Sequence, residues 1–363
     1  MAKNSPFDVS TWIRRLGLDF KDSITPYGLS CIFPYHQIRV DEPLLCAAAN
    51  YWVPSRHVFS FNRIELCPII EKFAVGESKI DDLIFPPMGG NLPSLLRVLL
   101  DVPTAIANRW CVFGKLNLKL VFEYFFSSTL LEGKGPCSYS LRAFCLCALA
   151  RYFLVQNLYC VDLWMCMIAY ELKRGNLVGL ILAETLNGLD AFHRKEANFF
   201  AGSPLLLQVC PSRHLTSSFI IIFFFLDMAT RETLVASTSY LTLSTYLPRH
   251  LRDRRLHWND IGFEAYMELM GRFKETDIQW VMEWWHISSM VHSCCKDHCV
   301  TIIGFRCCSY YSTCHISRKF GEHQGAPNNE RAYHTAMFTN NILGEISKAW
   351  SRRRVMKDII LPK

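Results

Sequence analysis

The sequence predicts a mainly α-helical protein, an irregular multi-helix globular fold with a few short β-strands. Apolar residues recur three and four positions apart through much of the chain, as in the leucines of 95–100, and this spacing is typical of helices with one buried face. Strand-like alternation is confined to short runs such as 58–61. The chain has 363 residues, of which 50% are hydrophobic, so it can bury a sizeable core; disordered, collagen-like and coiled-coil chains are excluded.

Up to residue 186 the pattern predicts short helices and one strand. A helix over 44–49 ends before Pro54, because the residue before a proline disfavours helix. The strand at 58–61 follows. Pro68 suits the first turn of the next helix, where its missing N–H costs no hydrogen bond. Further helices are expected at about 95–100, 116–126, 141–155, 161–172 and 176–186.

Residues 211–248 do not follow this pattern. An apolar run from Phe219 to Leu226 precedes a stretch rich in serine and threonine. One interpretation is a buried strand followed by a loop. The other is a foreign insert such as translated intron, because thymine-rich noncoding DNA encodes phenylalanine, isoleucine and leucine. Helical spacing resumes at 258, with a strand or buried turn at 300–305 and a closing helix at 340–350.

These changes of pattern predict four consecutive parts. They are a partly flexible opening segment at 1–30, an N-terminal helical part at 31–210, the atypical insert or loop at 211–248, and a C-terminal helical part with a basic tail at 249–363.

The cysteines and the polar start of the chain indicate a reducing compartment. Most of the 16 cysteines have apolar neighbours, as Cys145 and Cys147 do, and a thiol there packs as a small hydrophobe. The first six residues lack the apolar core of a secretory signal, so we expect the nucleus, with the cytoplasm as the alternative. No run reaches the roughly 18 to 20 apolar residues that cross a bilayer, and no membrane partner is expected.

Cysteine and histidine residues gather between His292 and His315. Zinc prefers four thiolate or imidazole ligands, usually as two close pairs. The candidate metal ligands are Cys295, Cys299, Cys308 and Cys314. Their spacing matches no standard zinc finger, and the alternative is that these thiols are buried on short apolar elements. No other cofactor is predicted.

Two arginine clusters are the candidate nucleic-acid-binding residues. They are Arg252, Arg254 and Arg255 in the first cluster, and Arg352, Arg353 and Arg354 in the second. Such clusters neutralise phosphates or act as nuclear-import signals, whereas the simpler alternative is a solvated helix face or helix end. The formal net charge of +7 and the pI near 8.6 permit weak attraction to polyanions, although typical nucleic-acid-binding domains have a pI above about 9.

No catalytic motif stands out, so no catalytic residue is predicted. The G-x-S-x-G, H-E-x-x-H and phosphate-binding glycine patterns are absent. Carboxylates such as Asp162, Glu184 and Asp190 are scattered, and the sequence does not indicate which of them would converge on a metal ion.

Three stretches together resemble the plant mobile domain family, the transposon-associated group also labelled aminotransferase-like, and related uncharacterised plant domains. The first runs from Leu44 through Trp52-x-Pro54 and 57–61 to Glu65-Leu66-Cys67-Pro68 and Glu71. The second is 199–208, and the third extends from Asp277-Ile278-Gln279-Trp280 to Arg318-Lys319-Phe320-Gly321, Gln324 and Pro327. Ile69 and Lys319 depart from the residues usual in the family.

The resemblance implies a largely helical domain of plant transposable elements and of domesticated nuclear proteins linked to silencing and genome stability. The expected function is a transposon-derived, non-enzymatic nuclear interaction module that binds protein partners, DNA or RNA. The alternatives are a transposase-related, metal-dependent phosphoryl transferase and a degenerate, non-functional relic. The family offers no catalytic residues to transfer, and no lysine here has the surroundings of a pyridoxal phosphate site. The sequence predicts no oligomeric state.

Overall fold

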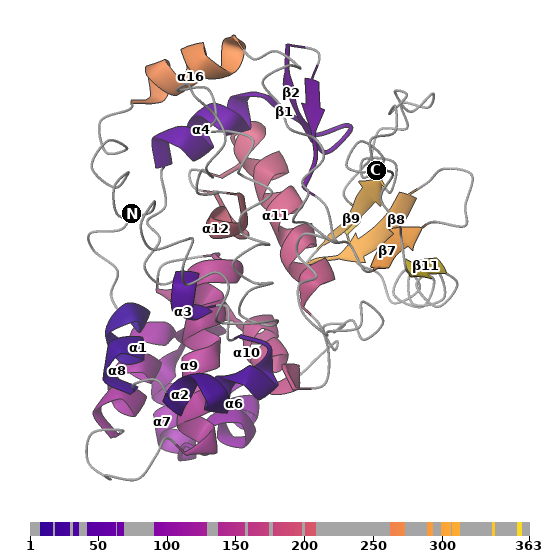
Figure 1. Ribbon diagram of the computed structural model, residues 1–363. Helices are drawn as coiled ribbons and strands as arrows, with labels where there is room; N and C mark the ends of the chain where they lie inside the picture. The colour runs from indigo at the N-terminus through magenta and orange to yellow at the C-terminus, as the bar shows by residue number, and fades with distance from the viewer. Residues whose placement is uncertain are drawn as a thin grey trace. The chain divides into compact units, whose positions relative to one another are not determined.

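The computed structural model describes sixteen stretches of the chain, and every structural statement below concerns these residues (Figure 1). They are 8–16, 19–29, 32–35, 42–62, 64–68, 91–128, 137–156, 159–173, 177–197, 200–207, 262–272, 289–292, 299–305, 307–312, 336–337 and 354–357. Helices dominate these stretches and the sheets have two or three short strands, which confirms the predicted mainly α fold. None of the described helices is both long and apolar enough to cross a membrane.

The chain divides into two compact units, and each draws on separated stretches of sequence. The first unit contains Met1–Val40, Asp81–Leu177 and Ala201–Leu205, and the second contains Asp41–Ile80, Val178–Phe200 and Leu206–Lys363. This division differs from the four consecutive parts that the sequence predicts. Helices pack here on partners that are distant along the chain, a relation that changes of local pattern do not reveal. The predicted insert at 211–248 lies outside the described residues.

The described part of the first unit is a group of helices with one small sheet. Its helical elements are α1 (Val9–Leu16), α2 (Asp19–Ile24), η2 (Thr25–Tyr27), α3 (Ile32–Tyr35), α6 (Leu92–Leu100), α7 (Thr104–Trp110), α8 (Leu118–Ser128), α9 (Ser138–Ala148), the π-helical turn η3 (Leu149–Phe153) and α10 (Leu163–Glu171). Strands β4 (Cys111–Val112), β5 (Lys115–Asn117) and β6 (Cys160–Asp162) form an antiparallel sheet in that order. The short helix α12 (Pro204–Leu207) contains the boundary between the units.

Helix α6 shows how local sequence sets the ends of an element. The Asn91 side chain accepts a hydrogen bond from the Ser94 N–H at 3.2 Å and caps the N-terminus. At the other end the Arg142 guanidinium donates to the carbonyls of Val98 and Leu99, each at 3.3 Å. Cations favour a helix C-terminus because the last carbonyls have no partner within the helix. Arg142 therefore ties α9 to the end of α6.

An aromatic cluster forms the core of the first unit. The fully buried Trp12 of α1 makes edge-to-face contacts with Phe122 and Phe144, at ring-centroid distances of 5.4 and 5.5 Å. Phe20 of α2 contacts Phe144 at 4.8 Å. Such contacts add to the free energy gained by removing the rings from water. The cluster therefore joins α1, α2, α8 and α9.

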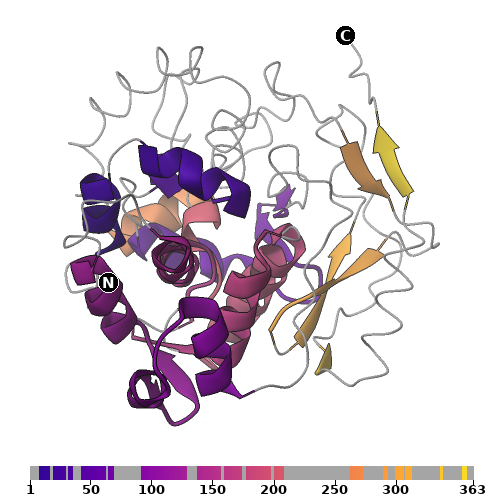
Figure 2. The same cartoon turned by 90° about the horizontal axis from the view of Figure 1, so that it is seen from below.

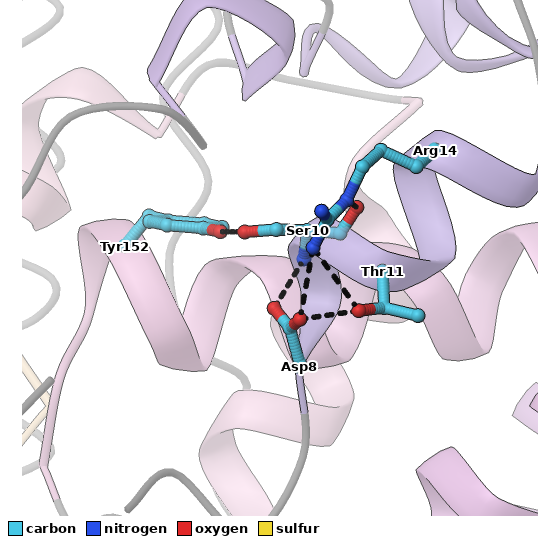
Figure 3. A network of polar contacts seen from close by, with 5 residues as sticks. All are labelled: Asp8, Ser10, Thr11, Arg14 and Tyr152. Atoms are coloured by element: carbon cyan, nitrogen blue, oxygen red, sulfur yellow. Dashed lines mark hydrogen bonds and ion pairs between the residues drawn. The ribbon is translucent and has the colours of Figure 1, made fainter. Parts of the chain in front are cut away.

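Asp8 caps helix α1 through a polar network (Figure 3). Its carboxylate accepts hydrogen bonds from the Ser10 N–H at 2.9 Å and from the Thr11 hydroxyl, and Arg14 lies 3.4 Å away. The Ser10 hydroxyl also meets the Tyr152 hydroxyl of η3 at 3.2 Å. Partial burial acts to raise the pKa of Asp8, but the hydrogen bonds from Thr11 and Ser10 outweigh it and lower that pKa below its ordinary value of 3.8.

Asp8→Ala is therefore expected to destabilise α1 in a pH-dependent way. A lowered folded-state pKa means that the ionised carboxylate stabilises the fold above about pH 4 and that this contribution disappears as the pH falls through the folded-state value. We expect a loss of about 0.5–1 kcal/mol at pH 7, at the low end for a cap because the side chain is half exposed. Denaturation of both proteins between pH 7 and pH 3 measures the difference.

Asp8→Asn is the matched control, because asparagine also caps helices but carries no charge. The Asp8→Asn variant should retain most of the free energy of unfolding that the cap contributes at pH 7. It should lack the contribution that disappears in the wild type as the Asp8 carboxylate is protonated. A difference between wild type and Asp8→Ala that stays constant down to pH 3 contradicts the assignment.

The described part of the second unit joins three helices to three small antiparallel sheets. Its helices are α4 (Glu42–Asn50), α11 (Val178–His193) and α16 (Phe263–Gly271). Its sheets are β1 (Trp52–Val53), β2 (Val58–Phe61) and β3 (Ile64–Leu66); β10 (Ala336–Met337), β9 (Cys307–Ser312) and β8 (Cys299–Ile303); and β11 (Arg354–Lys357) with β7 (Ser289–His292). Helix α4 packs against α16 and α11, and α11 packs against β8 and β9. The orange β8–β9 hairpin lies beside α11 in both views (Figure 1, Figure 2).

Several predicted elements can be compared with these bounds. The helix near 44–49, the strand at 58–61 and the strand or buried turn at 300–305 are confirmed as α4, β2 and the end of β8. The helix predicted over 141–155 is instead α9 followed by a π-helical turn, and the helix predicted at 161–172 begins with β6. The closing helix at 340–350 and most of the helix predicted after Pro68 lie outside the described residues.

Candidate functional site

The first sequence motif brings an indole, an imidazole and a carboxylate together inside the second unit. Trp52 lies in β1, His57 lies in the loop that leads to β2, and Asp190 lies in α11. The side chains of His57 and Asp190 are each only 3% exposed. Of the described residues, this buried pair has the groups closest to those of an acid–base site. We refer to Trp52, His57, Asp190 and Arg194 as the His57 cluster.

Asp190 is the centre of the cluster. Its Oδ1 accepts a hydrogen bond from Trp52 Nε1 at 2.7 Å, and its Oδ2 lies 3.3 Å from His57 Nε2. Arg194, one helical turn further on, places Nη2 3.7 Å from the same oxygen. Burial of a lone carboxylate would cost several kcal/mol, so these partners allow Asp190 to remain inside the protein.

His57 connects the cluster to the sheet of β8, β9 and β10. Its Nδ1 lies 2.9 Å from the backbone carbonyl oxygen of Tyr310 in β9. Because a carbonyl oxygen only accepts, Nδ1 must carry the proton in this bond. The ring also stacks on Trp52, with centroids 5.8 Å apart and planes 14° apart. His57 has a φ of 51°, in the left-handed region that a non-glycine residue occupies only where the surroundings hold it.

This arrangement holds three elements together and leaves little room for acid–base chemistry. A catalytic imidazole needs one nitrogen within hydrogen-bond reach of the proton that it moves. Here both nitrogens face protein acceptors, and the side chain is almost fully enclosed. The His57 cluster therefore acts as a clamp between the β1–β2 loop, α11 and β9.

The other described residues of the motif also serve the fold. Phe59 and Phe61 are 5% and 1% exposed and pack in the core. Glu65 of β3 forms an ion pair with Arg56 of the β1–β2 loop, and both side chains are partly buried. These described residues of the first motif therefore serve to fold the second unit.

A second close contact joins α11 to the turn after β8. The Phe305 N–H donates to Glu184 Oε1 at 2.5 Å. A Cβ on the neighbouring Gly304 would lie 2.3 Å from that oxygen and 2.8 Å from Asn187 Nδ2, so glycine is needed for this approach. The sequence presents Glu184 and Asp190 only as scattered carboxylates. Trp52 and His57, the buried partners of Asp190, and Phe305, the partner of Glu184, lie over a hundred residues away, so no local signal identifies these roles.

The zinc prediction is only partly accessible to the structure. Cys295 and Cys314 lie outside the described residues, whereas Cys299 and Cys308 lie on β8 and β9. Cys308 pairs with Ile303, which is four residues from Cys299 along β8, so their Cα atoms are about 13 Å apart. Because two of the four candidate ligands lie outside the described residues, the zinc site stays a prediction.

The predicted phosphate-contact arginines fall almost entirely outside the described residues. Only Arg354 is placed, at the start of β11, where its backbone lies opposite that of His292 in the antiparallel pair with β7. Among the described residues no group of three or more histidine, cysteine, aspartate or glutamate side chains is arranged to hold a metal ion.

The buried thiols confirm the expectation that many cysteines pack as small hydrophobes. Cys145, Cys147 and Cys166 are fully buried, and burial raises the pKa of each thiol far above its ordinary value of 9.0. Burial and the adjacent Cys307 raise the pKa of Cys308 to about 11. Because the thiolate is the reactive form, we expect these thiols to react slowly in the folded protein at neutral pH.

Alkylation should separate exposed from buried cysteines. Cys137 is exposed at the start of α9, and we expect iodoacetamide at pH 8 to modify it about 100-fold or more faster than Cys145 and Cys147. Trypsin cuts after Lys134, Arg142 and Arg151, so mass spectrometry distinguishes the Cys137 peptide from the Cys145–Cys147 peptide.

Labelling in urea is the control for this experiment, since all three thiols should then react at similar rates. Equal labelling of both peptides in the native protein contradicts the packing of α9.

Comparison of the chain with protein-family models, with curated proteins and with solved structures finds no match. The resemblance to the plant mobile domain family therefore depends on the motif residues. The structure places most of the first motif, from Leu44 to Pro68, and part of the second, including Gly202 and Ser203. The residues that carry the third resemblance, 277–280, 318–321, Gln324 and Pro327, lie outside the described residues.

Proposed function

We propose that the chain is a non-enzymatic nuclear interaction module of plant mobile domain type, derived from a transposable element, that binds nucleic acid or silencing and genome-stability partners. The observation that carries the proposal is the enclosure of the His57 cluster. The motif residues Trp52 and His57 contact Asp190 and the Tyr310 carbonyl and so hold β1, α11 and β9 together. A domain whose motif residues serve the fold in this way is suited to recognition.

The described carboxylates support a binding role in the same way. Metal-dependent phosphoryl transfer needs several carboxylates that converge on one or two cations about 3.5–4 Å apart. Asp162 instead pairs with Lys115, Glu184 accepts a backbone N–H, and Asp190 is held in the His57 cluster. Each of these three carboxylates already has a partner within the fold, and their partners lie in different parts of it.

The two arginine clusters supply the expected contacts with phosphates. Nucleic-acid affinity that depends on such contacts falls with salt, by about 0.9 in log K per tenfold change in salt for each phosphate on duplex DNA. Fluorescence anisotropy with duplex DNA and single-stranded RNA across a salt series measures this slope. We expect alanine at Arg252, Arg254 and Arg255, or at Arg352, Arg353 and Arg354, to weaken binding and flatten the slope.

The matched control replaces three exposed arginines outside the clusters, Arg14, Arg97 and Arg272, by alanine. The control should bind nearly as the wild type does. Equal effects of control and cluster variants contradict the assignment, and absence of binding at low salt leaves protein partners as the remaining form of the proposal. Metal-dependent nicking of DNA that is lost when aspartate or glutamate residues are removed would overturn the non-enzymatic assignment.

A further inference from the structure

The hairpin of β4 and β5 presents a bare aromatic ring in the first unit. Cys111 pairs with Leu116 and Val112 pairs with Lys115, so Phe113 and Gly114 form a two-residue turn. The Phe113 side chain is 100% exposed, and Val112 beside it is 46% exposed. A Cβ built on Gly114 would have no neighbour within 4 Å, so the turn projects into open space. We refer to residues 112–115 as the hairpin tip.

Phe113 is an unfavourable residue for the fold at this position. Its φ is 50° and that of Gly114 is 73°, the left-handed pair of a type I′ turn. Asparagine, aspartate and glycine are preferred at the first of these positions, whereas a bulky residue is strained there. The ring buries no surface that could compensate for the strain. The positive φ of Phe113 destabilises the fold, and no packing of the ring offsets this cost. Such an outlier indicates that the residue has a role outside the fold.

Three cations lie near the hairpin tip in the sequence, and two of them have carboxylate partners. Residues 102–122 contain Arg109, Lys115 and Lys119 and no aspartate or glutamate. Lys115 and Lys119 each lie 3.7 Å from a carboxylate oxygen, of Asp162 and Glu123 respectively, and both lysine side chains are about half exposed. The Lys119–Glu123 pair is half exposed on both sides and contributes little free energy, whereas the Asp162 side chain is only 16% exposed, so Lys115 keeps its carboxylate partner and offers a phosphate its remaining N–H donors. Arg109 is exposed in the last turn of α7, four residues before the ring.

We propose that the hairpin tip binds single-stranded nucleic acid, with a base stacked on Phe113 and the neighbouring phosphates contacted by Arg109 and Lys115. A single strand offers unpaired bases, whose faces stack on aromatic rings in any sequence, and a chain of phosphates for the cations. A protein partner would instead need about 800 Å² of contact around an apolar centre, whereas this ring is flanked by charges. The inference rests on the nucleic-acid form of the proposed function and specifies the strand that it binds.

Phe113→Asn tests the stacking directly. Asparagine tolerates a positive φ, so the turn should form at least as well, and the midpoint of thermal unfolding should equal or exceed that of the wild type. With fluorescein-labelled oligo(dT) and oligo(rU), we expect affinity to fall about 5- to 150-fold, the range that loss of one stacked base produces. Affinity for a blunt duplex should change less than about twofold, because its bases are already stacked.

Phe263→Asn is the matched control, since Phe263 is also exposed, at 37%, but belongs to α16 of the other unit. It should leave single-strand affinity unchanged. Phe113→Trp should retain or increase that affinity, because the larger ring stacks at least as well.

Salt dependence separates the ring from the cations. Phe113→Asn should lower single-strand affinity equally at every salt concentration, because stacking releases no counterions. Lys115→Ala and Arg109→Ala should each reduce the salt slope by about 0.7, the value for one phosphate on a single strand. Ultraviolet cross-linking to oligo(rU), followed by peptide mapping, should place the attached base within residues 110–115.

The outcomes distinguish this inference from the proposed function. If the wild type binds single strands and Phe113→Asn binds them equally well, the inference is wrong, while effects of the arginine-cluster variants would still support the proposed function. If Phe113→Asn loses binding and the arginine-cluster variants do not, the hairpin tip is the site and the clusters are ordinary surface. If the wild type binds duplex DNA but no single strand at low salt, the inference fails and the proposed function stands; if it binds neither, the inference and the nucleic-acid form of the proposed function both fail.

Discussion

Replacing Asp190 by alanine is expected to lower the free energy of unfolding of the second unit by about 1–3 kcal/mol, the usual cost of leaving buried hydrogen-bonding groups without their partner. The substitution removes the acceptor of Trp52 Nε1 and leaves His57 Nε2 and the Arg194 guanidinium without their shared carboxylate. Chemical denaturation followed by tryptophan fluorescence measures the loss. Amide hydrogen exchange should show faster opening in peptides from α11 and from 52–61.

Asp190→Asn separates the hydrogen bonds from the charge. Its side-chain oxygen can still accept from Trp52, so we expect a smaller loss than with alanine. Glu196→Ala is the control for removal of a carboxylate near the end of α11, because that side chain is 60% exposed, and it should cost less than about 0.5 kcal/mol. A loss for Asp190→Ala as small as that for Glu196→Ala would show that the cluster does not clamp the unit.

Trp12→Ala is expected to cost the first unit about 3–5 kcal/mol, as for other large aromatic residues truncated in a core. The indole is fully buried among Phe122, Phe126 and Phe144, which cannot fill the space that it leaves. Thermal and chemical denaturation measure the loss, and hydrogen exchange should show increased opening in α1 and α9.

Trp12→Phe should cost only about 1 kcal/mol. Within the described part of the chain, Trp12 Nε1 is buried without a hydrogen-bond partner, so removal of the N–H offsets part of the lost packing. Val98→Ala, at a side chain that is 56% exposed on α6, serves as the control and should have little effect. Equal losses for Trp12→Ala and Val98→Ala would contradict the assignment of Trp12 to the core.

The helix and strand assignments show where sequence patterns are sufficient. Periodic leucines predict α6, and the alternation at 58–61 predicts β2, because both signals lie within one element. The change from α9 to a π-helical turn within 141–155 left no such signal, since the residues are apolar on both sides of it. The buried state of Cys145 and Cys147 was also predictable, because their immediate neighbours are apolar.

The hairpin tip illustrates a different reason for a missed element. Turn prediction depends on glycine, proline, asparagine and aspartate, and Phe113 stands where one of these is preferred. Local preference therefore argues against a turn at the position where the cross-strand pairs of β4 and β5 require one. Phe113 has a backbone conformation that phenylalanine rarely adopts, and this conflict can be recognised only once the conformation is known.

The sequence by itself determined the helical class of this protein, its principal short elements and the packing role of many of its cysteines, because periodicity and local composition report on burial. Only the tertiary structure decided that His57 and Asp190 face each other, that Gly304 admits Glu184, and that Phe113 stands exposed. These relations join residues up to 133 positions apart or depend on a single backbone conformation. Long-range contacts form because the whole core excludes water around them, and no local pattern of residues encodes which distant partners will meet.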